Sequence, residues 1–204
     1  MKRHVYVGVL ALLAILPLNA QAPKGWKLRV DRSMTASDPD AAGDIKFMEM
    51  GGGFHAMNPK AAVYWNPANT ASGNYTLKGT FKLVKTMGHE EYYGLIFGGN
   101  DLEGAGQSYI YFMVEQGGSW LIKSRSGSST SQIASSGGPS DAVKKGDASN
   151  ALEVHVTGDK VEFLVNGKVV NTTPKSALKT DGVYGIRINH MLEVQIDGFG
   201  VSKM

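Results

Sequence analysis

The regular alternation of apolar and polar side chains near the C-terminus constrains the fold more than any other feature of the sequence. From Leu152 to Val156, and again from Val161 to Val165, every second residue is apolar. This period of two is typical of an antiparallel strand that is buried on one side. Gly158-Asp159 separates the two runs and Asn166-Gly167 follows the second, and both dipeptides suit tight hairpin turns because they tolerate positive φ. The segment therefore predicts a three-stranded meander.

The same period recurs elsewhere in the chain. Tyr75 to Leu83 alternates apolar residues with Thr and Lys, and the last strand, from Leu192 to Val201, changes phase at Gly198, which predicts a β-bulge. We expect the other strands at Trp26–Val30, Ile45–Met50, Ala62–Trp65, Tyr92–Phe97, Tyr109–Glu115, Trp120–Ser124 and Val183–Asn189. The Ser- and Gly-rich stretch Ser124–Ser140 is predicted to be a long surface loop. No segment has a helical apolar stripe, so about ten to fourteen short strands predict an all-β sandwich or barrel.

The N-terminus has the layout of a cleavable signal peptide. Lys2 and Arg3 precede an apolar run from Val5 to Leu18, and small residues follow at Ala20 and Ala22. The run is too short for a transmembrane helix, so no membrane span is expected. Cleavage after Ala20 is preferred because a cut after Ala22 would place Pro23 next to the scissile bond. The chain is therefore predicted to comprise a signal peptide (1–20) and one β-sandwich domain (21–204), secreted or periplasmic.

Composition argues against several classes of partner. Removing Lys2 and Arg3 reduces the 21 Lys and Arg residues to 19, against 18 Asp and Glu residues, so the mature chain is almost neutral. It has no basic cluster, and we expect neither nucleic-acid binding nor binding to a membrane surface. The chain has no cysteine, so packing alone must stabilise the domain, and thiolate metal sites are excluded.

A family resemblance emerges from these patterns. The run Asn150–Gly167 resembles the late strands of concanavalin A-like jelly rolls, and most of all the bacterial 3-keto-disaccharide (3-keto-glucoside) hydrolases and laminin G-like domains. Tyr93–Phe97 followed by Tyr109–Val114 is similar to the middle of that pattern, and Gly182–Phe199 to its end. The resemblance covers about Tyr75 to Met204 and implies an antiparallel β-sandwich that binds or processes carbohydrate.

Two departures qualify what the resemblance implies about activity. Gly98-Gly99 stands where the 3-keto-glucoside hydrolases often have an arginine. The Glu-x-Asp-x-x-Glu strand of the related glucanases does not occur anywhere in the sequence, so glucanase activity is not expected.

The candidate binding surface is a sheet face with aromatic side chains. Tyr109, Tyr111 and Met113 share one side of a predicted strand while Ile110, Phe112 and Val114 share the other, so both faces are apolar. Sugars stack on aromatic rings while Asn and Arg orient their hydroxyl groups. The candidate ligand-binding residues on this concave face are Tyr92, Tyr109, Tyr111, Trp120, Arg187 and Asn189. The competing interpretation is that loops cover these rings, which then form a second apolar layer.

Catalytic and metal-binding candidates are fewer. Glu115 and His190 are the carboxylate and imidazole that could act as acid and base on this face. The sequence predicts either no cofactor or calcium. Asp101 and Glu103 lie in a Gly-rich loop where, by the resemblance to laminin G-like domains, calcium is expected. The segment Asp38–Asp44 has the early acidic spacing of a calcium loop but lacks its later ligands.

Three functions follow from these residues. The first is a domain that binds a carbohydrate or glycoconjugate on its aromatic face. The second is a hydrolase or lyase that acts on 3-keto-glucosides at the same face, and the third is a structural or adhesive module that binds another protein.

Overall fold

The computed structural model describes residues 23–32, 36–88 and 90–204, and the predicted signal peptide (1–20) lies outside them. These residues form two seven-stranded sheets in which every pairing is antiparallel. The first sheet has the order β1 (Lys27–Asp31), β4 (Ala61–Ala71), β13 (Gly182–Ile188), β6 (Tyr93–Asn100), β7 (Ser108–Val114), β8 (Ser119–Ser126) and β9 (Ser129–Pro139). The second has the order β12 (Lys168–Pro174), β11 (Lys160–Val165), β10 (Ser149–Val156), β5 (Tyr75–Thr86), β14 (Leu192–Lys203), β3 (Gly53–Asn58) and β2 (Lys46–Met50).

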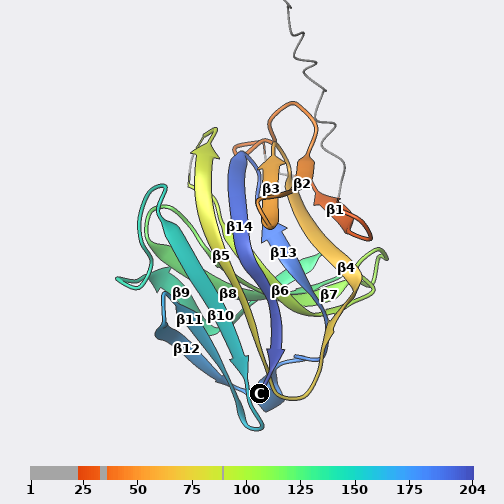
Figure 1. Cartoon of the computed structure of the whole chain (residues 1–204), viewed down its shortest axis with the longest axis vertical. Helices are drawn as coiled ribbons and strands as arrows, with labels where there is room; N and C mark the ends of the chain where they lie inside the picture. Colours follow the sequence, from red (N-terminus) through yellow and green to blue (C-terminus); the bar gives the residue numbers. More distant parts are fainter. Residues whose placement is uncertain (1–22, 33–35, 89) are drawn as a thin grey trace, which may run out of the picture.

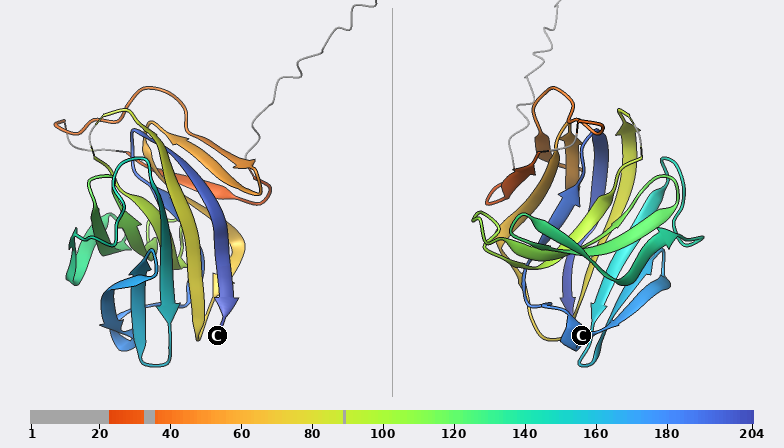
Figure 2. Two further views of the ribbon diagram at one scale, coloured as in Figure 1. Left: turned by 60° about the vertical axis from the view of Figure 1, so that its left-hand side comes forward. Right: turned by 180° about the vertical axis from the view of Figure 1, so that it is seen from behind.

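The two sheets pack face to face. In Figure 1, β10, β5 and β14 of the second sheet run in front of β6, β7 and β8 of the first, and the turned views of Figure 2 show the two layers. The core between them contains aromatic and aliphatic side chains from both sheets, including Leu77, Phe112, Phe163 and Ile186, all inaccessible to solvent. The predicted β-sandwich is confirmed. The described residues contain one short helix, η1 (Lys175–Ala177), and no helix there is long and apolar enough to cross a membrane.

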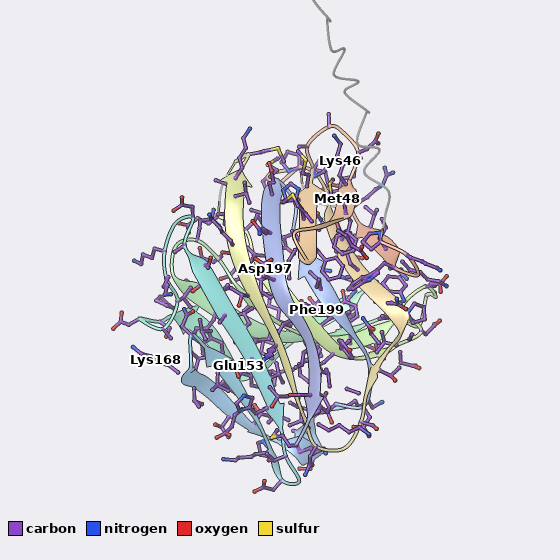
Figure 3. The ribbon with its side chains drawn as sticks, in the orientation of Figure 1. Lys46, Met48, Glu153, Lys168, Asp197 and Phe199 are labelled. Carbon is purple, nitrogen blue, oxygen red and sulfur yellow. The ribbon has the colours of Figure 1, made fainter. Side chains whose placement is uncertain are left out.

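The strand predictions agree with the structure wherever the alternation is regular. The predicted meander is β10–β11–β12, and Figure 3 shows polar side chains such as Glu153 on its outward face. The β-bulge expected at Gly198 is also present, because the pairing of β14 with β5 shifts between Asp197 and Gly200.

The stretch Ser124–Ser140 was wrongly predicted to be a loop. It contains the end of β8 and all of β9, and the two strands pair as a hairpin in which Ser126 faces Ser129. Ser and Gly have little intrinsic preference for strands, so the pairing with β8 determines the structure here. Strand β3 was also missed, since Gly51-Gly52-Gly53 masks a short apolar alternation.

The central strands of the first sheet, β6 and β7, differ from those of the second in being buried on both faces. All residues of β6 except Asn100 and all residues of β7 except Ser108 are buried, whereas buried and partly exposed residues alternate along β10. The prediction that both faces of Tyr109–Val114 are apolar is confirmed. Ile110, Phe112 and Val114 face the second sheet, while Tyr109, Tyr111 and Met113 face away from it. We call this second side of the first sheet its outer face.

Candidate functional site

An aromatic and aliphatic cluster covers the outer face of the first sheet. Its buried members are Val63, Trp65, Ile96, Leu102, Tyr109, Tyr111 and Met113. Tyr109 is 2% exposed and Tyr111 5%, so neither ring is free for a sugar to stack on. The predicted open aromatic groove is therefore corrected to a second apolar layer, and any ligand at this face must contact the polar side chains above it.

Two of the aromatic candidates lie away from this cluster's centre. Trp120 pairs with Val114 across β7 and β8, and directly opposed residues of a sheet share a face. The structure accordingly places Trp120 in the core between the sheets, which corrects its prediction as a ligand-binding residue. Tyr92 is partly exposed and packs at the cluster's margin.

Three arginines surround one aspartate above the aromatic cluster. Arg187 of β13 donates to Asp31 of β1 at 2.5 Å, and the side chains of Arg125 and Arg29 approach the same carboxylate at 3.8 and 3.9 Å. Arg187 also donates to the hydroxyl of Tyr109 at 3.0 Å, and its guanidinium lies 5.4 Å from the ring centre of Tyr111. These contacts hold a charged layer against the aromatic one.

The charged layer shifts the pKa values of the groups within it. Burial alone would lower the pKa of Arg187, but the nearby Tyr109 and Asp31 together outweigh burial and raise the pKa, so the guanidinium stays charged. Burial raises the pKa of Tyr109 and Tyr111, against the opposing effect of Arg187, so both hydroxyls stay protonated.

A pocket of about 200 Å³ opens beside this layer, and we call it the outer-face pocket. It is lined by Asp31, Arg32, Asp38, Ala61, Glu91, Arg125, Arg187, Asn189 and His190. Three of the predicted site residues, Arg187, Asn189 and His190, are therefore brought together. Arg187 lies near the end of β13 and Asn189 directly follows the strand, so the two project from the same face, and His190 begins the turn to β14.

His190 is the most enclosed titratable group of the pocket. Its Nε2 lies 3.0 Å from Glu91 Oε1 and 3.0 Å from Asp38 Oδ1, and its Nδ1 lies 3.1 Å from Asp40 Oδ1. Burial would lower the pKa of His190, but the hydrogen bond to Asp40 and the charges of Glu91 and Asp38 outweigh it and raise the pKa.

Glu115, the predicted acid–base partner of His190, does not line the outer-face pocket. Its carboxylate accepts hydrogen bonds from the backbone amides of Gly117 and Ser119, in the turn between β7 and β8. The structure thus gives Glu115 a role in closing a hairpin and places Glu91 next to His190 instead.

The two predicted calcium ligands also have structural contacts. Asp101 accepts a hydrogen bond from the backbone amide of Gly106 within its own loop, and Glu103 forms an ion pair with Lys27 at 2.5 Å. Arg29 donates to the carbonyl of Gly104 at 2.6 Å and so holds this loop over the outer face.

Sequence reasoning missed Asp31 and Glu91. Asp31 ends β1 and Glu91 precedes β6, and neither stands in a motif that marks it. The acidic spacing at Asp38 and Asp40 did carry a signal, but it predicted a self-contained calcium loop, whereas both side chains contact His190, far away in the chain.

Comparison with known proteins supports the fold and gives no family. No family model matches the chain, and no curated protein matches it. Among solved structures, the carbohydrate-binding module CBM66 of Bacillus subtilis is similar with a TM-score of 0.61 and 10% identity, over 88% of this chain and 96% of that one. A Bacillus subtilis protein of unknown function with a galectin-like fold is similar with a TM-score of 0.58 and 12% identity, over 88% of this chain and 90% of that one.

A third similar structure is the Bacteroides ovatus mixed-linkage glucan GH16 protein in complex with an oligosaccharide product. It gives a TM-score of 0.55 and 11% identity, over 91% of this chain and 97% of that one. At such identities the similarity shows the fold alone. The chain therefore has a jelly-roll β-sandwich fold similar to those of these proteins, with an outer face on which charged side chains surround a small pocket.

Proposed function

We propose that the protein binds carbohydrate and that the outer-face pocket takes one sugar residue. The observation that carries the proposal is the convergence of Asp31, Arg187 and Asn189 on this pocket, above a buried aromatic layer. Sugar hydroxyl groups both donate and accept hydrogen bonds. A carboxylate supplies acceptors, a guanidinium supplies donors and an amide supplies both, so this set matches a ring of hydroxyl groups.

The volume of the pocket limits the size of the ligand that it can hold. Pockets for drug-sized molecules typically have volumes of about 300–1,000 Å³, and the outer-face pocket has about 200 Å³. It fits a single ring better than several, which favours a terminal residue of a glycan over the middle of a chain. That similar folds include a carbohydrate-binding module and a GH16 protein in complex with an oligosaccharide product supports the proposal without naming the sugar.

Asn189→Ala tests the pocket. Losing a hydrogen-bonding amide costs about 1–1.5 kcal/mol, which corresponds to about a tenfold weaker Kd. We expect that loss for any glycan that the wild type binds on an array and in calorimetric titration. Asn171→Ala, in β12 of the second sheet, is the matched control and should leave the Kd unchanged. Failure of the wild type to bind any mono- or oligosaccharide would refute the proposal, and equal binding by Asn189→Ala would refute the site.

We further propose that the protein is secreted or periplasmic, on the strength of the signal at residues 1–20. Expression of the full chain in a bacterial host should yield an exported protein whose N-terminal sequence begins at Gln21. Full-length protein that remains in the cytoplasm, with Lys2 and Arg3 still present, would contradict this localisation.

A further inference from the structure

Three acidic side chains from separate parts of the chain meet around one imidazole in the outer-face pocket. Asp38 and Asp40 belong to the loop before β2, Glu91 precedes β6, and His190 lies in the turn between β13 and β14. The His190 side chain is only 6% exposed, with Glu91 at 11% and Asp40 at 15%. Such an enclosed meeting of carboxylates and an imidazole nitrogen requires either a protonated histidine or a cation.

The spacing of the atoms matches a coordination sphere. Two carboxylate oxygens, from Asp38 and Glu91, and a ring nitrogen of His190 lie within 4.8 Å of one another. Each oxygen is 3.0 Å from His190 Nε2. Ligand atoms that lie ~2.1 Å from a metal ion in tetrahedral coordination are ~3.4 Å apart, a few tenths of an ångström more than these separations. A metal ion can therefore be accommodated with only small side-chain movements.

A second set of contacts orients these three groups. Asp40 lies 3.1 Å from Nδ1 of His190, and a carboxylate in that position accepts the Nδ1 proton and leaves Nε2 with its lone pair. Asn189 donates to Glu91 Oε2 at 2.7 Å, which turns Oε1 of the same carboxylate toward the imidazole. Carboxylate–histidine–metal arrangements in proteins use the same support.

An independent feature points to a missing partner at this place. The Oδ1 atom of Asn189 is buried and accepts no hydrogen bond from the part of the chain that the structure describes. Buried polar atoms almost always have a partner, which can be a water molecule or an ion-bound water. Asn189 lines the same pocket as His190, so a hydrated ion held there would supply that partner.

We propose that the outer-face pocket is a site for a divalent transition-metal ion, with Asp38, Glu91 and His190 as ligands. Zn²⁺ fits the donor set best, because imidazole nitrogen favours Zn²⁺ whereas Ca²⁺ prefers an all-oxygen shell. Three protein ligands leave a coordination position open to the pocket. Asp40 and Asn189 act as positioning residues. This inference goes beyond sugar binding and does not depend on it.

The test is a calorimetric titration of the purified, untagged protein with Zn²⁺ after treatment with a chelator, with Mn²⁺ and Ca²⁺ titrated in parallel. We expect one Zn²⁺ per chain, a higher Tm in its presence, and weaker binding of Ca²⁺. No sugar is present, so the result stands whether or not the protein binds carbohydrate. Absence of Zn²⁺ binding would overturn the proposal, and equally tight Ca²⁺ binding would overturn the assignment to a transition metal.

Substitutions of the proposed ligands test where the ion binds. Asp38→Asn and Glu91→Gln should each weaken Zn²⁺ binding by more than about tenfold, and Asp38 is partly exposed, so its variant should fold normally. His155→Gln is the control, because His155 forms a similar pair with Glu153 at 2.9 Å on the second sheet. Unchanged Zn²⁺ affinity in Asp38→Asn and Glu91→Gln, or an equal loss in His155→Gln, would contradict the assigned ligands.

Discussion

Replacing Asp31 with Asn is expected to lower the free energy of unfolding by about 3–5 kcal/mol. The substitution keeps the shape of the side chain but removes the negative charge that faces Arg187, Arg125 and Arg29. Asp31 and Arg187 are about 90% buried, so solvent screens the charge of Arg187 poorly once its counter-charge is removed. Breaking a buried ion pair by removing one partner is costly because the other charge stays buried.

Chemical denaturation monitored by tryptophan fluorescence measures this loss, and Asp159→Asn is the matched control. Asp159 is exposed in the turn between β10 and β11, where it accepts a hydrogen bond from Thr157, and its variant should stay within about 0.5 kcal/mol of the wild type. An Asp31→Asn variant as stable as this control would show that the arginines do not depend on the carboxylate.

Phe163→Ala should have a comparably large effect through a different mechanism. Phe163 of β11 is inaccessible to solvent, and its ring lies 5.3 Å from that of Phe112 and 6.1 Å from that of Phe97, both in the opposite sheet. The truncation removes contacts that join the two layers and leaves a cavity, at a cost of about 3–5 kcal/mol.

The control for Phe163→Ala lies in the neighbouring strand. Val169 of β12 is 53% exposed, so Val169→Ala should change the free energy of unfolding by less than about 0.5 kcal/mol. Equal denaturation midpoints for the two variants would contradict the placement of Phe163 between the sheets.

The sequence predicted the fold well where side-chain alternation reports burial directly. The meander from Leu152 onward and the two-sided burial of Tyr109–Val114 both follow from a period of two. The strand Ser129–Pro139 could not be predicted in this way, because its small polar residues carry no apolar alternation. Its extended conformation depends on hydrogen bonds to β8, which are long-range information.

The candidate site was predictable only where its residues come from one short segment, at the end of β13 and just after it. Arg187, Asn189 and His190 are neighbours in the chain, so their common location needed no knowledge of the topology. Asp31 and Glu91 reach the same pocket because β1 and β6 flank β4 and β13 in the sheet, and strand order cannot be derived from periodicity. Trp120 was misplaced because its aromatic character was considered without the phase of its strand.

The way the outer-face pocket is assembled has a consequence for how ligands act on the whole molecule. Its walls come from an edge strand, an N-terminal loop and the turn between β13 and β14, so the unfolded chain cannot present them together. A ligand that binds only the folded state stabilises it by about 2.7 kcal/mol at a free concentration a hundred times its Kd. Occupancy of the pocket would therefore suppress detachment of β1 from the sheet, and ligand supply would regulate how long the protein survives among proteases.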